Sequence, residues 1–354
     1  MINFRQYPNC TKIVIPGNVR LSTTNFSEAF SWMQKLQYLD IDRSVEEKIN
    51  VISNGRKGIC YRCSKLIKTA VCGSNVTNMS NAYNTCTNLT TAVCGNNVTS
   101  MSSAYSGCTN LTTAVCGNNV TSMSDTYNRC TKLTTAVCGP NVIDMRGAYY
   151  RCTNLTTTVC GDKVTDMSSA YSMCPNLTTA VCGPNVTSMS SAYSSCNNLT
   201  TAVCGDKVTN MSGAYYVCTN LTTAVCGPNV TDMKFAYSSC SNLITAACGP
   251  NVTDMNRAYF ASPKIQGNAY FYSNNVRSVD NCFNRRNTNN ILNIYVHLNT
   301  RSMNECLTQS YDTLTGSAIT WTNDSTNNRY YNTQANIYIY PVANVYQAKV
   351  DNGD

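Results

Sequence analysis

Cysteine is the residue type through which this chain could most readily do chemistry. The 354 residues include 22 cysteines but a single histidine. Cysteine thiolates bind zinc, usually as two pairs of ligands, and cysteine thiols also form disulfides. Only Cys60-x-x-Cys63 has the zinc-ligand spacing, and the sequence offers it no second pair, so we interpret these two residues as structural. We therefore expect no metal site and no cofactor.

The sequence pattern also fails to assemble a catalytic site. General acid–base and nucleophilic catalysis need a nucleophile, a base and a group that orients the base. The one histidine, His297, lies in an alternating, β-prone segment, and no glycine-rich loop of the phosphate-binding kind is written in the chain. We expect a protein that is not an enzyme.

Most of the cysteines follow an internal repeat of 22 residues. One copy, Thr91 to Thr112, reads TAVCGNNVTSMSSAYSGCTNLT, and the pattern runs from Thr69 to about Phe260 without insertion or deletion. A fixed period of this length is the signature of a repeat solenoid, in which each coil buries its apolar face against its neighbours. Later copies begin at Thr113, Thr135, Thr157, Thr179, Thr201, Thr223 and Thr245.

Apolar positions at fixed offsets predict the shape of one coil. The Leu-x-x-Ala-x-Cys stretch predicts a short parallel β-strand, with Ala92 and Cys94 facing inward and Thr91 and Val93 facing outward. The glycine that follows predicts a turn. The Val-x-x-Met-x-x-Ala-Tyr stretch has the spacing of a short helical or 3-10 return, so each coil should contain one strand and one return.

The pattern Cys-x-x-Leu-x-x-Ala-Val-Cys-Gly-x-x-Val-x-x-Met-x-x-Ala-Tyr-x-x-Cys resembles the BspA-like class of leucine-rich repeats. In this resemblance Cys94 takes the place of the family's strand isoleucine and Met101 that of its second isoleucine. Tyr105 replaces the family's phenylalanine, and Cys108 matches its cysteine. The resemblance covers about residues 60 to 310 and implies a leucine-rich-repeat-like solenoid. It also implies a surface adhesin of a host-associated microbe, or a virion protein of a phage that infects such a microbe.

The repeat places cysteines in two columns. In coils stacked about 4.8 Å apart, equivalent side chains point the same way rather than towards each other, so we predict buried, reduced thiols instead of systematic disulfides. The strand column comprises Cys94, Cys116, Cys138, Cys160, Cys182, Cys204 and Cys226, and the turn column comprises Cys108, Cys130, Cys152, Cys174, Cys196, Cys218 and Cys240.

The fit to the repeat divides the chain into four parts. Residues 1–68 read as divergent N-terminal capping repeats, and residues 69–260 as the regular solenoid. Residues 261–312 read as degenerate repeats, and residues 313–354 as a β-rich C-terminal cap or assembly segment. Caps are expected because the open ends of a stack would otherwise expose unpaired backbone groups.

Smaller predictions concern the two flanks. In the N-terminal flank, Ile13–Ile15 and Leu36–Ile41 predict strands, and the charged Asp42–Lys48 predicts an exposed loop or a short helix. In the C-terminal flank, Ile291–Val296 predicts a strand and Met303–Leu307 a return, so that two further coils follow the regular copies.

Two columns of residues are predicted to face outward from the strands and to form a uniform Thr-x-Val surface. A repeat protein that recognises an irregular protein partner would vary along this face, whereas this chain varies after the glycine, after the methionine and after the tyrosine. The candidate surface comprises Thr91, Val93, Thr113, Val115, Thr135, Val137, Thr157, Val159, Thr179, Val181, Thr201, Val203, Thr223 and Val225.

Charge and hydropathy exclude several partners. Residues 69–260 carry eight Lys or Arg against seven Asp, so the formal charge of +8 lies mostly in the flanks. A basic stripe of the kind that binds nucleic acid is therefore not expected, and no apolar run is long enough to insert into a membrane. The N-terminus lacks a secretory signal, and Asn-Val-Thr recurs as a formal glycosylation sequon, so we interpret the chain as one made in a bacterial or viral cytoplasm.

Three functions remain open. The first is a phage virion component, such as a tail fibre, a receptor-binding protein or a capsid decoration protein, and the missing signal sequence favours it. The second is a bacterial cell-surface adhesin. The third is a binder of a repetitive ligand, polysaccharide or ice, through the Thr-x-Val surface. The expected partners are other virion proteins or a host-surface receptor, protein or glycan, and further copies of the chain.

Overall fold

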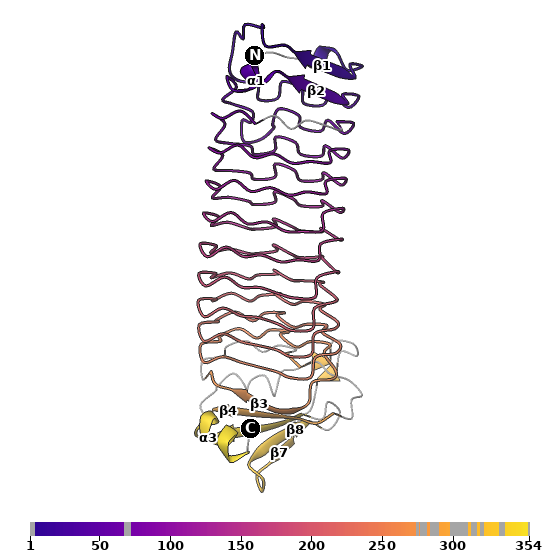
Figure 1. Cartoon of the computed structure of the whole chain (residues 1–354). Helices are drawn as coiled ribbons and strands as arrows, with labels where there is room; N and C mark the ends of the chain where they lie inside the picture. The colour runs from indigo at the N-terminus through magenta and orange to yellow at the C-terminus, as the bar shows by residue number, and fades with distance from the viewer. Residues whose placement is uncertain are drawn as a thin grey trace. The chain divides into compact units, whose positions relative to one another are not determined.

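The computed structural model describes residues 4–66, 72–273, 276, 282–283, 290–297, 311–312, 317–318, 322–332 and 337–352. The chain divides into two compact units, Met1–Leu177 (unit 1) and Thr178–Asp354 (unit 2). Within each unit, coils of the 22-residue repeat stack in parallel (Figure 1). The return predicted at Met303–Leu307 lies outside the described residues. Among the described helices, none has the length and apolar character that crossing a membrane requires.

The N-terminal end of unit 1 holds a pair of parallel strands. After a 3-10 turn, η1 (Phe4–Gln6), strand β1 (Lys12–Ile15) pairs with β2 (Tyr38–Ile41). A short helix, α1 (Arg43–Glu46), follows β2, and the carboxylate of Asp42 caps its first turn. The strands and the helix lie where the sequence predicts them.

One half of each coil, from the methionine to the leucine that follows the turn-column cysteine, is a run of tight turns. This half is the turn segment, which in the copy quoted above is Met101–Leu111. The Ala104 amide donates to the Met101 carbonyl at 2.8 Å, and Ser103 between them has a left-handed φ of 55°. The predicted helical or 3-10 return is therefore wrong, because successive turns produce the three-residue spacing that suggested it.

The turn segment carries most of the backbone hydrogen bonds between coils. The Met101 amide donates to the Ser122 carbonyl of the next coil at 3.0 Å, and the Tyr105 amide donates to the Thr126 carbonyl at 3.0 Å. Isolated parallel bridges, such as the one from Ser100 to Ser122, lie just before the turns. Alternate amides thus point along the stack, which ties each coil to its neighbour.

The other half of the coil, the Thr-Ala-Val-Cys segment, forms only isolated bridges in the described part of the chain. Its amides find side-chain partners. The Val137 amide donates to the Tyr149 hydroxyl at 2.8 Å, and that hydroxyl donates back to the Val137 carbonyl at 2.6 Å. The Ala136 amide donates to Oγ1 of Thr157 in the next coil at 3.0 Å. The predicted strand is not formed, because these side chains satisfy backbone groups that a neighbouring strand would otherwise pair.

The core of each unit consists of columns of one residue type. Val98, Met101, Ala104, Tyr105 and Cys108 are fully buried, and so are their counterparts in the other regular copies wherever the type is kept. The tyrosine rings of successive coils stack nearly parallel, with centroids about 5.5 Å apart. Each coil therefore buries its apolar side chains against identical ones above and below.

Unit 2 ends in a five-stranded sheet that continues the parallel stacking and then reverses it. The strand order is β3-β4-β9-β8-β7, in which the first two pairings are parallel and the last two antiparallel. The strands are β3 (Gly267–Phe271), β4 (Leu292–His297), β9 (Ile337–Val342), β8 (Arg329–Asn332) and β7 (Thr322–Asp324). Strand β4 lies where the sequence predicts one.

A hairpin and a helix complete the described part of the C-terminal flank. Strands β5 (Tyr311–Asp312) and β6 (Ser317–Ala318) pair antiparallel. Helix α3 (Val345–Asp351) contacts β3 and β4 (Figure 1), and the side chain of Asn344 caps its N-terminus. The sequence predicts the β-rich character of this flank but not α3, whose start is marked by that single asparagine cap.

Candidate functional site

The turn-column cysteines are buried thiols with a structural role. Cys130 donates its thiol hydrogen to the Tyr105 carbonyl of the preceding coil at 3.2 Å. Burial raises the pKa of Cys130 well above its usual range, so the nucleophilic thiolate is suppressed. At the end of the regular copies Ser262 takes the cysteine's place, and its hydroxyl makes the same bond to the Tyr237 carbonyl at 2.9 Å. In this coil a hydroxyl group replaces the thiol as the hydrogen-bond donor.

The strand-column cysteines are only half-buried in most coils, which corrects the expectation that they face fully inward. The glycine of the next coil lies against each sulfur. A Cβ added to Gly139 would lie 2.8 Å from Sγ of Cys116, and the Gly139 amide donates to that sulfur. Burial raises the pKa of Cys116 to about 12. These thiols join neighbouring coils and are poor nucleophiles.

Neither cysteine column offers a metal site in the described part of the chain, where no group of three or more His, Cys, Asp or Glu could hold an ion. A direct count of free thiols tests the prediction that the column cysteines are reduced. Titration with Ellman's reagent in denaturant, without reductant, should show that most column cysteines react. Reaction of fewer than about half of them would instead reveal systematic disulfides.

The Thr and Val columns predicted to face outward do not form a flat sheet. Threonines such as Thr135 are exposed, but Val137 is half-buried and its backbone is held by the Tyr149 hydroxyl. Thr157 is exposed as well, yet its hydroxyl accepts the bond from Ala136 of the preceding coil. Part of the polar capacity of this surface is thus used within the fold.

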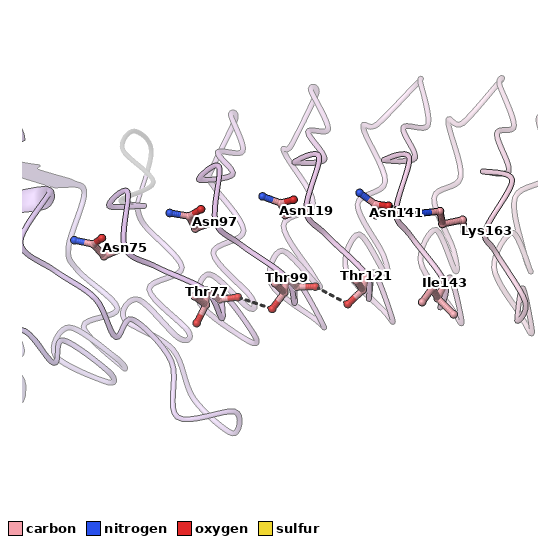
Figure 2. Close-up of a pocket in the computed structure, with 9 residues that line it drawn as sticks. All are labelled: Asn75, Thr77, Asn97, Thr99, Asn119, Thr121, Asn141, Ile143 and Lys163. Carbon is pink, nitrogen blue, oxygen red and sulfur yellow. Dashed lines mark hydrogen bonds between the residues drawn. The ribbon is translucent and has the colours of Figure 1, made fainter.

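An open groove runs along unit 1 beside the columns that follow the glycine turn (Figure 2). Its volume is about 680 Å³. Figure 2 shows its lining as two parallel rows, one of asparagines and one of threonines, with one member of each row contributed by each coil. The lining residues are Asn75, Thr77, Asn97, Thr99, Asn119, Thr121, Asn141, Ile143 and Lys163.

Hydrogen bonds to the preceding coil fix the orientation of both rows. The amide nitrogen of Asn97 donates to the Ser74 carbonyl at 2.7 Å, and the asparagines of the next coils repeat this bond at 2.8 Å. The Thr99 hydroxyl donates to the Thr77 carbonyl at 3.2 Å, and Thr121 repeats it (Figure 2). Each threonine hydroxyl and one N–H of each asparagine amide donate within the stack, so the rows offer acceptor oxygens, threonine methyl groups and the second asparagine N–H to a ligand.

The groove is polar but nearly uncharged. No described group of the chain donates to Oδ1 of Asn97 or Asn119, so these oxygens are available acceptors. Its lining includes no carboxylate, and Lys163 is its only cation. At one end of the groove the Lys163 ammonium donates to Oδ1 of Asn141 at 2.6 Å. In the coil of Asn141, Ile143 takes the place of the threonine, so the asparagine row and the threonine row both end there. The arrangement can accept hydrogen bonds at every coil, and it has no group for acid–base or nucleophilic catalysis.

Sequence reasoning predicted a repetitive surface on the Thr and Val columns and did not single out the columns that line the groove. The groove residues belong to the Asn-Val-Thr triplets, which the sequence shows as formal glycosylation sequons. The buried valine between them, Val98 in one coil, holds the asparagine and the threonine on the same side of the chain. Recurrence of both polar residues around an invariant buried position is the signal that could have identified this surface.

Comparison with known proteins adds a family match and two similar structures. The chain matches the family model described as BspA type leucine rich repeat region (6 copies), over residues 2–134, 55–178, 129–234 and 167–291. No curated protein sequence matches the chain.

Solved structures that are similar to this chain include two leucine-rich proteins. One is a leucine-rich repeat protein from Bacteroides ovatus, with 13% identity and a TM-score of 0.40, over 70% of this chain and 82% of that chain. The other is a leucine rich cell surface protein from Faecalibacterium prausnitzii, with 19% identity and a TM-score of 0.49, over 77% of this chain and 86% of that chain.

Proposed function

Because the chain belongs to the BspA-type leucine-rich repeat family, we propose that it is a non-enzymatic binding protein of a bacterial surface, of the adhesin type. The family match supports a binding or structural role. A tail fibre, receptor-binding or capsid decoration role in a phage virion has no support among these comparisons, so the bacterial surface replaces the virion as the proposed location.

We further propose that the repeats act as a solenoid scaffold with a cap at each end. Strands β1 and β2 with α1 would protect the first coil of unit 1. The five-stranded sheet with α3 would protect the last coil of unit 2. These are the segments in which the side-chain pattern of the repeat gives way to other structure, which is where caps are needed.

The ligand best suited to the groove of unit 1 is an extended neutral polysaccharide. The observation that carries this proposal is the pair of rows, which repeats one amide oxygen and one threonine with each coil. A polysaccharide presents hydroxyl donors and apolar ring faces at regular intervals, and these match acceptor oxygens and threonine methyl groups. An ice surface is flat, whereas this surface is hollow, so ice is the weaker candidate.

Retention of the full chain on immobilised neutral polysaccharides tests the proposal. The double variant Thr99→Ile/Thr121→Ile should lose retention, because it fills the groove and removes two hydroxyls. Isoleucine is already present at this position as Ile143, so the coil accepts it. Thr135→Ala, on the neighbouring column, is the control and should bind normally. Retention that survives the double variant would rule out the groove as the binding site.

A separate measurement tests the location. Antibodies raised against the purified chain should label intact bacteria that express it, and protease added outside the cells should abolish that labelling. Labelling that appears only after the cells are broken would contradict a surface role while leaving the polysaccharide test unaffected.

A further inference from the structure

A second surface of unit 1 differs from the groove in charge and composition. It consists of the two residues on each side of the buried turn-column residue in successive coils, here named the cysteine edge. Met33 holds the cysteine's place in the first of these coils, and Cys63 and Cys130 are later examples. The edge of unit 1 contains no Asp or Glu, but it contains Lys35, Arg62, Lys65, Arg129, Lys132 and Arg151.

The cations of this edge are not neutralised by described carboxylates, although Lys35 donates to Oδ1 of Asn9 and Arg151 to Sδ of Met173. All are exposed except Arg151, which is half-buried, and none forms an ion pair with a described carboxylate. Two carboxylates near this edge in sequence have other partners: Glu28 pairs with Lys57 at 3.7 Å, and Asp125 accepts a hydrogen bond from Asn128 at 3.0 Å. The sequence argument missed this stripe because it counted net charge along the chain, whereas the coils sort charges onto different columns.

The backbone holds these side chains in a fixed row. The Arg62 amide donates to the carbonyl of the next coil at 2.8 Å, the Arg129 amide does so at 2.7 Å, and the Arg151 amide at 2.9 Å. All three arginines have left-handed φ angles, between 60° and 62°, at a position where Gly107 has the glycine that this conformation favours. Thr85, Met173 and Ser195 have the same left-handed φ in other coils, so the conformation belongs to the fold, and it sets the row on which these three arginines stand.

Aromatic side chains accompany the arginines. The Arg62 guanidinium lies 4.5 Å from the ring centre of Trp32 and 5.5 Å from that of Tyr61, and Trp32 remains 42% exposed. In the second cluster, Arg151 lies 5.3 Å from the ring of Tyr150. Exposed aromatic rings beside arginine provide both a flat stacking surface and an anion-binding group.

The spacing of the cations selects the kind of anion. Between Arg62 and Arg129 two coils carry only hydroxyl, amide and small side chains, a gap of about 14 Å at the usual spacing of stacked strands. A nucleic acid strand carries a phosphate about every 3.4 Å and would leave several charges unmatched across this gap. A polymer with sparser charges and hydroxyl groups between them matches the whole row.

We propose that the cysteine edge of unit 1 binds an acidic polysaccharide, a linear chain of sugars that bear carboxylate or sulfate groups. Arg62 and Arg129 mark its two charged contacts, Trp32 and Tyr150 offer faces for sugar rings, and the neutral coils between them contact hydroxyl groups. This ligand and surface are distinct from the neutral polysaccharide and the groove proposed above. In the described coils of unit 2, from Cys196 to Ser262, the corresponding edge carries one cation, Lys264.

Binding of the full chain to chondroitin sulfate oligosaccharides, measured by calorimetry over a range of salt concentrations, tests this proposal. Arg129→Ser/Arg151→Ser should weaken binding at low salt by at least about tenfold and make the salt dependence shallower, because fewer counterions are released. Serine already stands at this position as Ser195 and Ser239, both with left-handed φ, so the variant should fold, as its circular-dichroism melt would verify.

A second double variant controls for net charge. Lys207→Asn/Lys234→Ser also removes two positive charges and lies outside both proposed sites, and other coils carry asparagine and serine at these two positions. This variant should bind the sulfated oligosaccharide normally. Equal losses in both variants, or a loss in the lysine variant alone, would overturn the proposal. So would single-stranded oligo-dT that binds as tightly and loses affinity equally in Arg129→Ser/Arg151→Ser, which would identify a nucleic acid site. Neutral polysaccharide retention should be unchanged in the arginine variant, so the two proposals can fail separately.

Discussion

The two halves of a coil contribute to the stack in different ways. In the turn segment, alternate backbone amides donate hydrogen bonds to carbonyls of the next coil, as the Tyr105 amide donates to the Thr126 carbonyl. The Thr-Ala-Val-Cys segment instead has its backbone held by side chains, chiefly by the tyrosine hydroxyl of its own coil, as Val137 is held by Tyr149. Cohesion between coils therefore comes from turns and buried columns, and the stretch with the highest β-propensity contributes least to it.

The largest expected effect comes from the buried leucine column, which ends the turn segment of each coil. Leu155 is fully buried, so Leu155→Ala should lower the free energy of unfolding by about 2–5 kcal/mol through the cavity it leaves. Thr135→Ala is the matched control, because Thr135 is exposed and its hydroxyl has no described partner. Urea melts of both variants give the comparison. Equal losses would mean that the leucine column does not carry the stability of the stack.

A smaller loss in the free energy of unfolding should follow when the tyrosine hydroxyl that holds the Thr-Ala-Val-Cys segment is removed. Tyr149→Phe keeps the stacked ring but leaves the Val137 amide and carbonyl without their shared partner, which should cost about 1–3 kcal/mol. Amide hydrogen exchange should quicken at Val137 and not at Tyr149, whose amide bonds to the next coil. Unchanged exchange at Val137 would show that another group holds this segment.

The comparison of the two halves also explains what the sequence could and could not predict. Buried types at fixed offsets, such as Leu155 and Tyr149, follow from period and hydropathy alone, because every coil repeats them. The absence of a strand at the Thr-Ala-Val-Cys segment could not be predicted in this way. Valine has a high β-propensity, and propensity cannot show that the hydroxyl of a tyrosine twelve residues after Val137 satisfies its backbone groups. The groove and the cysteine edge depend on which columns become neighbours, and only the turns at residues such as Ser103 determine that.

Alkaline pH should weaken both halves together. Burial raises the pKa of Cys116 to about 12 and holds that of Tyr149 well above its usual range. Unfolded thiols and phenols titrate near about 8.5 and 10, so above these values the unfolded chain binds fewer protons than the folded one. The contribution of these groups to the free energy of unfolding should then be constant below about pH 8 and fall progressively between about pH 8.5 and 12. Urea melts across this range measure it, and a rise with pH would contradict the burial of these groups.

The smallest effect is expected at the buried cysteine of the turn segment, where a hydroxyl can replace the thiol as hydrogen-bond donor. Cys130→Ser should cost less than about 1 kcal/mol, because serine can donate to the Tyr105 carbonyl as Ser262 donates to that of Tyr237. Cys130→Ala removes the donor and should cost more than the serine variant, although the Tyr105 carbonyl keeps its bond from the Cys108 amide. Thermal melts rank the two. If serine were as damaging as Leu155→Ala, the volume and polarisability of sulfur would govern this column, and the substitution at Ser262 would be tolerated only because it lies at the end of the regular copies.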